Sequence, residues 1–285
     1  MRLEDFDHGE RFTARLLDSQ RITPTDAVEV RELKLLLDKH DFQAEAGQSV
    51  GVIVPGLREI GQRHHFRLYS LAGAPQRRDD GTVEITLCVR RCNYIDEYSG
   101  EEYRGVASNF LCDLRPGGSV EMNGPFGIPF RVPADPTANL LLVSMGTGIA
   151  PFRAFVATLY RRHPDWKGRI WLFHGAVSGL ELLYMNDERD DFSNYYDRDT
   201  FRAFQALSPR PHWADPIAMD YAIEERAAEL WEMLCEDRTH VYLAGKGDIL
   251  QNLDKIFAGM AGSPEEWEQH KLQMKDAGRW VELLY

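Results

Sequence analysis

An aliphatic block that runs into a glycine turn constrains this chain more than any other feature. Residues 140–143 read Leu-Leu-Leu-Val, and Gly146-Thr147-Gly148 follows after two further residues. Such an aliphatic run is typical of a strand that is buried on both faces. Pro151 then stands where a helix would start, because its ring presets φ and its missing N–H would have no partner there.

The residues after Pro151 predict a helix. Apolar side chains recur at the spacing of one helix face, namely Phe152, Phe155, Val156, Leu159 and Tyr160. A strand, a glycine turn and a helix start, in that order, let a nucleotide approach bare backbone N–H groups at the positive end of a helix. The segment therefore predicts a dinucleotide site.

Composition narrows the class of protein. The 285 residues suggest two domains, each able to bury a core. The chain carries 33 basic and 45 acidic residues, a net charge of −12, which argues against general nucleic-acid binding. No apolar run approaches the roughly 20 residues of a membrane span, so no such span is expected. Arginines are concentrated in the first half of the chain. They could form a basic face that steers an anionic partner, or they could be scattered, solvated side chains.

The cysteines and the amino terminus bear on location and metal content. The four cysteines match no zinc or iron–sulfur spacing, so no metal is expected; they are Cys88, Cys92, Cys112 and Cys235. The charged first residues lack the apolar core of a secretory signal. We therefore expect a cytoplasmic protein.

The texture of the sequence changes near residue 135. Short alternating or β-branched runs at 50–54, 66–71, 83–90 and 119–122, with one helical run at 108–114, predict an antiparallel β-barrel over 21–135. Residues 1–20 are expected to be a polar lead-in, and 132–137 a linker.

Beyond the linker, strand candidates alternate with helical segments. The strands are expected at 140–144, 170–173 and 240–244, and the helices at 151–162, 223–236 and 249–260. This alternation predicts a doubly wound parallel-sheet α/β domain over 136–285.

Several short motifs have both a ligand-binding and an ordinary structural interpretation. Arg67 and Tyr69 share one strand face, which suits a ligand with a phosphate and a planar ring, or is a plain exposed sheet face. Ser108 is a candidate helix cap at a second anion site, or caps a routine turn.

The second half contains further candidates of the same kind. Glycines end two more of its strands, at Gly175-Ala176 and Gly245, where open α/β sheets bind ligands and where steric reasons also favour glycine. Ser208 and Arg210 could bind an adenosine 2′-phosphate, or lie in a surface loop. The apolar carboxy terminus is expected to be packed, so that Tyr285 covers a planar ligand.

Taken in order, the motifs of this chain resemble those of plant-type ferredoxin–NADP⁺ reductases from about residue 20 onward. The matching segments are Arg67-Leu68-Tyr69-Ser70, Cys88-Val89-Arg90-Arg91, residues 105–114, residues 146–152, residues 229–234 and the terminal Tyr285. The resemblance implies an FAD-binding barrel followed by an NADP(H)-binding α/β domain.

The resemblance also implies roles for individual residues. Toward FAD, Tyr69 would stack on the isoalloxazine ring, Arg67 would neutralise the pyrophosphate, and Ser70 would approach flavin N5. Tyr94 would stack on the adenine. The remaining FAD contacts would come from Cys88, Val89, Arg90, Gly105, Val106, Ala107, Ser108, Thr147 and Tyr285.

For NADPH, the resemblance implies a second set of residues. It comprises Gly146, Thr147, Gly148, Gly175, Ala176, Ser208, Arg210, Tyr221 and Gly245. Catalytic positions would be Ser70, Tyr285, Ala244 and Glu282, with Tyr285 a gate over the flavin face.

The chain departs from the family pattern at several of these positions. Ala244 stands where the family usually has cysteine, and Glu282 precedes Tyr285 by three positions instead of two. Pro209 separates Ser208 from Arg210, which bears on the preference for NADP over NAD.

The expected function is an FAD-dependent oxidoreductase that passes electrons between NADPH and a one-electron carrier such as ferredoxin or flavodoxin. Two alternatives stay open. One is the reductase component of an oxygenase or another multi-protein pathway. The other is a flavin-bearing regulatory or docking subunit without turnover.

Overall fold

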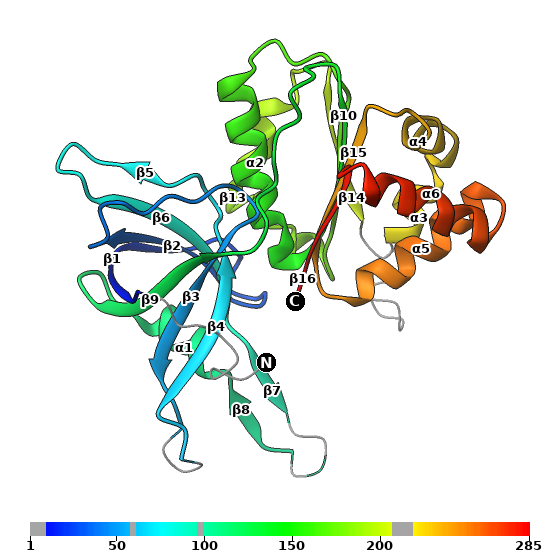
Figure 1. Cartoon of the computed structure of the whole chain (residues 1–285). Helices are drawn as coiled ribbons and strands as arrows, with labels where there is room; N and C mark the ends of the chain where they lie inside the picture. Colours follow the sequence, from blue (N-terminus) through cyan, green and yellow to red (C-terminus); the bar gives the residue numbers. More distant parts are fainter. Residues whose placement is uncertain (1–9, 58–60, 96–97, 99, 207–218) are drawn as a thin grey trace. The chain divides into compact units, whose positions relative to one another are not determined.

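The structure is a computed structural model that describes residues 10–57, 61–95, 98, 100–206 and 219–285. The chain divides into two compact units, residues 1–129 and 130–285 (Figure 1). The division falls between Pro129 and Phe130, six residues before the boundary that the sequence predicts. The aromatic side chain of Phe130 accounts for the shift, because it stacks on Phe152 in the second unit.

The first unit is built on an antiparallel sheet of seven strands in the order β4-β3-β9-β1-β2-β6-β5. The strands are β1 (Phe12–Arg21), β2 (Val30–Leu37), β3 (Ser49–Pro55), β4 (His64–Ser70), β5 (Gln76–Arg77), β6 (Val83–Arg90) and β9 (Ser119–Phe126). An isolated antiparallel bridge between Leu71 and Leu87 joins the β4 end of the sheet to β6. The sheet therefore closes on itself, and the predicted antiparallel barrel is confirmed.

A short helix and a hairpin complete this unit. Alternate strand residues fill the barrel with aliphatic side chains, and α1 (Val106–Asp113) adds Ala107, Leu111 and Cys112 to the same core. The hairpin of β7 (Asn93–Ile95) and β8 (Glu102–Arg104) leads directly into α1. The barrel core therefore anchors α1 and, through it, the base of the hairpin.

The second unit contains a parallel sheet in the order β14-β11-β10-β15-β16. These strands are β10 (Asn139–Met145), β11 (Ile170–Gly175), β14 (Phe201–Ala206), β15 (Thr239–Gly245) and β16 (Trp280–Leu284). A small antiparallel pair, β12 (Met185–Asn186) and β13 (Arg189–Asp190), lies in the connection from β11 to β14. Every side chain of β10 except Met145 is buried, as the aliphatic run at its start predicts.

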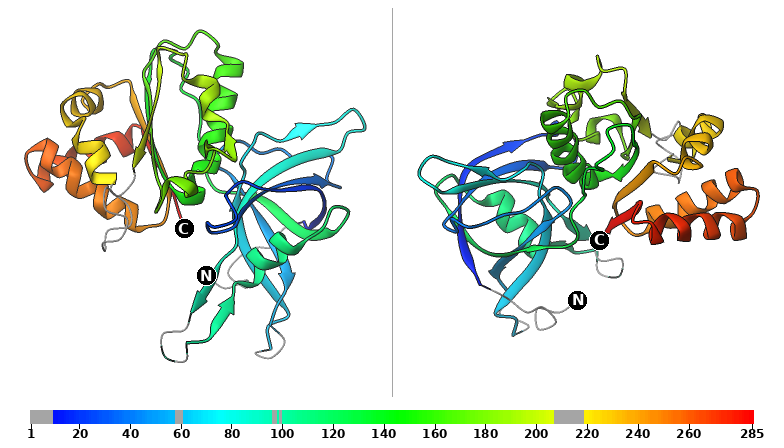
Figure 2. Two further views of the ribbon diagram at one scale, coloured as in Figure 1. Left: turned by 180° about the vertical axis from the view of Figure 1, so that it is seen from behind. Right: turned by 45° about the horizontal axis from the view of Figure 1, so that its top comes forward.

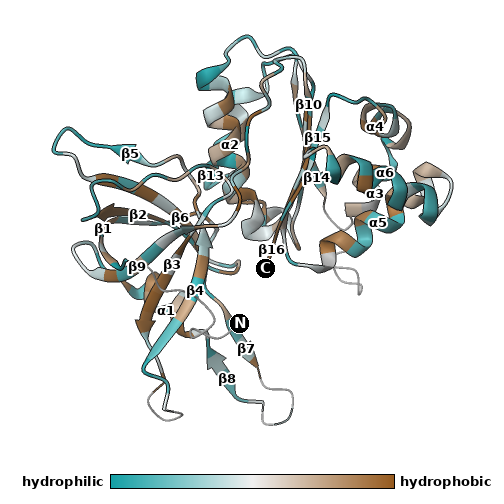
Figure 3. Cartoon of the chain, in the orientation of Figure 1, coloured by the Kyte–Doolittle hydropathy of each residue, from teal (hydrophilic) through white to brown (hydrophobic). Residues whose placement is uncertain are grey.

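Helices cover both faces of this sheet (Figure 2). One face receives α2 (Ile149–Arg162), and the other receives α3 (Met219–Glu224), α4 (Ala227–Leu234), α5 (Asp248–Ala261) and α6 (Pro264–Asp276). Hydrophobic colour follows β10 and β15, whereas α6 is largely hydrophilic (Figure 3). The predicted doubly wound α/β domain is confirmed.

Some elements differ from the sequence prediction. The prediction of a lead-in through residue 20 is wrong for residues 12–20, because β1 occupies the middle of the barrel sheet and pairs with both β2 and β9. The helix predicted over 223–236 is two helices, α3 and α4, with a break at residues 225–226. Among the described residues, no helix is both long enough and apolar enough to cross a membrane.

A glycine beside the sheet gives a test of this packing. A β-carbon added to the buried Gly168 would lie 1.7 Å from the carbonyl oxygen of Ala138, at the start of β10. Gly168→Ala is therefore expected to lower the free energy of unfolding by about 2–3 kcal/mol, because backbone atoms must move. Chemical denaturation of the full chain measures this loss.

Gly259→Ala is the matched control. Gly259 is an exposed residue of α5 with open space around its α-carbon, and alanine favours a helix over glycine by about 1 kcal/mol. This variant should be at least as stable as the parent. Equal stability of the two variants would contradict the packing described here.

Candidate functional site

The first group of predicted site residues lies on β4. The side chain of Tyr69 packs against the barrel core, and burial raises the pKa of its phenol, so that the ring stays neutral. The guanidinium of Arg67 is close enough to oppose this shift, and it donates to the carbonyl oxygen of Phe66 at 2.8 Å. Ser70 places its hydroxyl 3.2 Å from that of Ser49 on β3. The structure therefore brings Arg67 and Tyr69 together, as the strand alternation predicts.

The start of α1 is a backbone site of the kind that the sequence suggests. Asn109 makes the first intrahelical bond, its N–H donating to the carbonyl oxygen of Gly105 at 3.1 Å. The three preceding N–H groups, at residues 106–108, have no intrahelical acceptor and suit an anion. A β-carbon on Gly105 would lie 2.7 Å from the carbonyl oxygen of Cys92, so glycine is required there.

Ser108 is not the helix cap. The N-cap is Gly105, and Ser108 lies within the helix, where its hydroxyl accepts from the N–H of Cys92 at 3.1 Å. The same hydroxyl donates to the carbonyl oxygen of Gly105 at 3.3 Å. The prediction that Ser108 caps α1 is therefore wrong, because the helix begins two residues earlier, at Val106. The side chain of Ser108 instead fastens the helix to the start of the hairpin.

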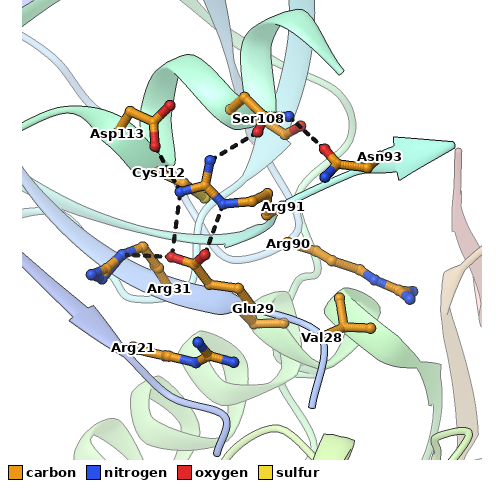
Figure 4. Close-up of polar contacts among 12 residues, drawn as sticks. Arg21, Val28, Glu29, Arg31, Arg90, Arg91, Asn93, Ser108, Cys112 and Asp113 are labelled. Carbon is orange, nitrogen blue, oxygen red and sulfur yellow. Dashed lines mark hydrogen bonds and ion pairs between the residues drawn. The ribbon is translucent and has the colours of Figure 1, made fainter. Parts of the chain in front are cut away.

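The last residues of β6 and the hairpin lie near α1. Arg90 makes no side-chain hydrogen bond or ion pair within the described part of the chain, and Figure 4 shows it extending away from Arg91. Cys88 and Val89 are buried, so their side chains are not open to a ligand in this structure. Tyr94 is 61% exposed and stacks on Tyr103 at 5.2 Å between ring centroids.

The glycine turn of the second unit is a 3-10 turn, Gly146–Gly148, that continues into α2. A β-carbon on Gly148 would lie 2.1 Å from the carbonyl oxygen of Ala244, so the turn rests directly on β15. Gly146 has φ +54° and open space where a β-carbon would be. Pro151 is the third residue of α2, still in the first turn, where its missing N–H costs no helical bond.

The carboxy terminus returns to this turn. The hydroxyl of Tyr285 lies 2.9 Å from that of Thr147, and its backbone N–H donates to the carbonyl oxygen of Gly245 at 3.1 Å. Three predicted residues from distant parts of the sequence, Thr147, Gly245 and Tyr285, therefore meet at one edge of the sheet.

Comparison with known proteins gives the family. The chain is 34% identical over 282 residues to the chloroplastic ferredoxin–NADP reductases of Mesembryanthemum crystallinum and Spinacia oleracea. The match covers 96% of this chain and 76% and 75% of those proteins. The chain belongs to the ferredoxin–NADP reductase family. Residues 142–255 match the oxidoreductase NAD-binding domain family.

A solved structure supports the fold of this family member. The ferredoxin–NADP⁺ reductase of Plasmodium falciparum superposes with a TM-score of 0.75 over 99% of this chain and 98% of that one. The sequence identity between the two is 18%, so the agreement concerns architecture.

Glu282 lies on the other face of the sheet from Ala244. Strand pairing puts Leu283, not Glu282, beside Ala244. The carboxylate of Glu282 accepts from the indole N–H of Trp280 at 2.6 Å and pairs with Lys275 of α6 at 3.0 Å. Glu282 therefore ties β16 to α6. A carboxylate one position later, at residue 283, would lie on the face of Ala244.

The other predicted nucleotide residues are spread over the second unit. Gly175 ends β11 and the neighbouring Ala176 is buried, whereas Tyr221 on α3 is 57% exposed. Ser208 and Arg210 lie outside the described residues. Among the described residues, no group of three or more His, Cys, Asp or Glu side chains could hold a metal ion.

A buried polar pair, which was not predicted from the sequence, lies next to the glycine turn. His174 and Ser144 occupy adjacent positions on β11 and β10, and Nδ1 of His174 lies 2.9 Å from Oγ of Ser144. Both side chains are fully buried, and burial lowers the pKa of His174 to about 4. Polar residues at corresponding positions of two aliphatic strands are the signal that could have revealed this pair.

The pKa of His174 predicts a loss of stability in acid. Between its ordinary value of 6.5 and about 4, the unfolded chain binds a proton at His174 that the folded chain does not. The free energy of unfolding therefore falls as the pH is lowered through this range, by roughly 2 kcal/mol from this group at pH 4.5. Urea denaturation at pH 7 and pH 4.5 measures the fall.

His174→Leu removes the group that binds this proton. The fall in the free energy of unfolding between pH 7 and pH 4.5 should therefore be smaller than in the parent. His64→Gln, at an exposed position of β4, should leave the difference as it is in the parent. An acid-induced loss as large in His174→Leu as in the parent would show that His174 does not contribute to it.

Proposed function

We propose that this chain is an FAD-dependent oxidoreductase that passes electrons between NADPH and a one-electron carrier such as ferredoxin or flavodoxin. The observation that carries the proposal is the 34% identity to ferredoxin–NADP reductases over almost the whole chain. In each unit a helix also begins directly after a glycine that packs against a backbone carbonyl, and the residues proposed to bind a nucleotide lie around it.

The side chains of the first unit fit FAD. The cationic Arg67 lies beside the neutral ring of Tyr69, which suits a ligand that combines a phosphate with a planar ring. The free N–H groups at the start of α1 suit the pyrophosphate, and Tyr94 offers an exposed ring for the adenine. Arg90 is available for a further phosphate contact.

The second unit fits a dinucleotide. Open space at Gly146 and Gly247 lets a ligand approach the backbone at the carboxyl edge of the parallel sheet. We assign Gly175, Ala176, Gly245 and Tyr221 to the same nucleotide. Ser208 and Arg210 remain the proposed partners of the 2′-phosphate, on sequence grounds alone.

FAD, when bound, supplies exchange of a hydride with nicotinamide and of single electrons with a carrier. The role of this chain is to bind and orient. Tyr69 and Arg67 would fix the flavin ring and its phosphates, and Ser70 would place its hydroxyl near them. In the second unit, Tyr285 would leave Thr147 to admit the nicotinamide, which makes the terminal tyrosine a gate. Ala244 adds no ionisable group, and Glu282 is engaged by Trp280 and Lys275.

We also propose a cytoplasmic location. The four cysteines are free in the structure, as is usual in a reducing compartment.

The direct test of the function uses purified full-length protein. We expect it to contain FAD in stoichiometric amount and to oxidise NADPH with ferricyanide as electron acceptor. A flavin-free protein that FAD cannot reconstitute would overturn the proposal. A flavin-loaded protein that does not oxidise NADPH would overturn the enzymatic role and leave the docking-subunit alternative.

Removal of Arg67 tests the phosphate assignment. Arg67→Ala should raise the dissociation constant for FAD about tenfold, because a charge-assisted contact is lost. Fluorescence quenching of FAD by the apoprotein measures the constant. Arg63→Ala, an exposed arginine just before β4, is the control and should bind FAD as the parent does. Equal weakening in both variants would indicate a general charge effect.

Changes at the terminal tyrosine test the gate. Tyr285→Ser removes the ring and its bond to Thr147, so NADP⁺ should bind more tightly than to the parent. Tyr285→Phe loses only the hydroxyl contact and should show a smaller gain. Calorimetric titration with NADP⁺ measures both affinities. If the parent and the two variants bind NADP⁺ equally, the terminal residue does not restrict access to the turn.

A further inference from the structure

A buried amide joins the two ends of the β7–β8 hairpin. Asn109, in the middle of α1, is 6% exposed. Its Nδ2 donates to the carbonyl oxygen of Cys92 at 3.1 Å and to Oδ1 of Asn93 at 3.0 Å, both at the start of the hairpin. The same nitrogen donates to the carbonyl oxygen of Gly105 at 2.9 Å, at the hairpin's end. One side chain therefore holds both ends of residues 92–105.

Two arginines fix the orientation of this amide. Oδ1 of Asn109 accepts from the guanidinium of Arg91 at 2.8 Å and from Nε of Arg104 at 3.1 Å. An arginine can only donate, so the oxygen of the amide must face the arginines and the nitrogen must face the three hairpin oxygens. The reversed amide would point its nitrogen at two cationic donors.

Arg91 is in turn held by two carboxylates (Figure 4). Its Nε donates to Glu29 at 2.7 Å, in the segment before β2, and its terminal nitrogen donates to Asp113 at 2.8 Å, at the end of α1. The hydrogen bond and charge of Arg91 lower the pKa of Glu29, so that this carboxylate is ionised at neutral pH. Because the planar guanidinium of Arg91 bonds a carboxylate on each side, its orientation is fixed.

We propose that Asn109, fixed by Arg91, is a positioning residue for the FAD site. Asn109 holds the base of the β7–β8 hairpin against the first turn of α1, where the free N–H groups lie. This hairpin carries Tyr94. Neither side chain needs to touch the cofactor. Without this link, binding would have to order the hairpin, and that cost would appear as weaker affinity. This inference rests on the proposed function, since it takes FAD to be the ligand.

Asn109→Asp is the sharpest test, because it replaces one heavy atom and adds a negative charge that faces the two arginines. The arginines keep their acceptor, but an oxygen replaces the nitrogen that donates to the three hairpin oxygens. We expect the dissociation constant for FAD to rise about tenfold. We also expect faster amide hydrogen exchange at residues 93–95 and 102–104 in the apoprotein. The exchange measurement needs no cofactor.

Arg91→Lys is the second variant, since lysine retains the charge but has no planar fork to reach Asn109 and both carboxylates. It should change FAD affinity and hairpin exchange in the same direction. Val120→Ala is the stability control, because Val120 is buried in the barrel core and belongs to neither the hairpin nor α1. It should lower the melting temperature while the FAD constant stays within twofold of the parent.

The outcomes separate the possible failures. Unchanged FAD affinity and hairpin exchange in Asn109→Asp would overturn the inference. Weakening of FAD binding in Val120→Ala, in proportion to its lost stability, would also overturn it, since the effect would then be general. If the parent binds no FAD, the proposed function fails, and faster hairpin exchange in Asn109→Asp would still support the structural link.

Discussion

The close approach of Gly148 to the carbonyl of Ala244 is the constraint on which the nucleotide-binding half of this protein depends. Any larger residue at 148 would collide with the backbone of β15. Because glycine allows this contact, α2 can begin directly at the carboxyl edge of the sheet, with Gly146 open beside it. The carboxy-terminal strand lies next to β15, and so Tyr285 reaches Thr147.

The first unit solves the same physical problem in another architecture. Gly105 packs against the carbonyl of Cys92, and the helix that follows presents N–H groups without intrahelical acceptors. A barrel strand and a hairpin replace the parallel strands as support. Here side chains contribute as well, because Ser108 and Asn109 both fasten α1 to the hairpin. In both units, glycine supplies the close approach and a helix start supplies the donors.

Much of this arrangement follows from local sequence patterns, and some of it does not. Aliphatic runs and glycines located β10, α2 and the turn between them, because burial and close approach act on adjacent residues. Strand alternation could also have assigned Glu282 to the face of Trp280, two residues earlier. The place of β1 in the barrel and the hydrogen bonds of Asn109 could not be predicted, because each depends on partners outside the local segment. The helix-capping role expected of Ser108 failed for a local reason, since α1 begins at Val106 and Ser108 is already its third residue.

The proposed activity requires that one chain bring a reduced nicotinamide nucleotide and a flavin into reaction. Anaerobic stopped-flow mixing of the FAD-loaded protein with NADPH, and separately with NADH, tests this most directly. We predict rapid loss of the visible flavin absorbance with NADPH, and slower loss with NADH at the same concentration. Flavin that stays oxidised with both nucleotides would contradict the account.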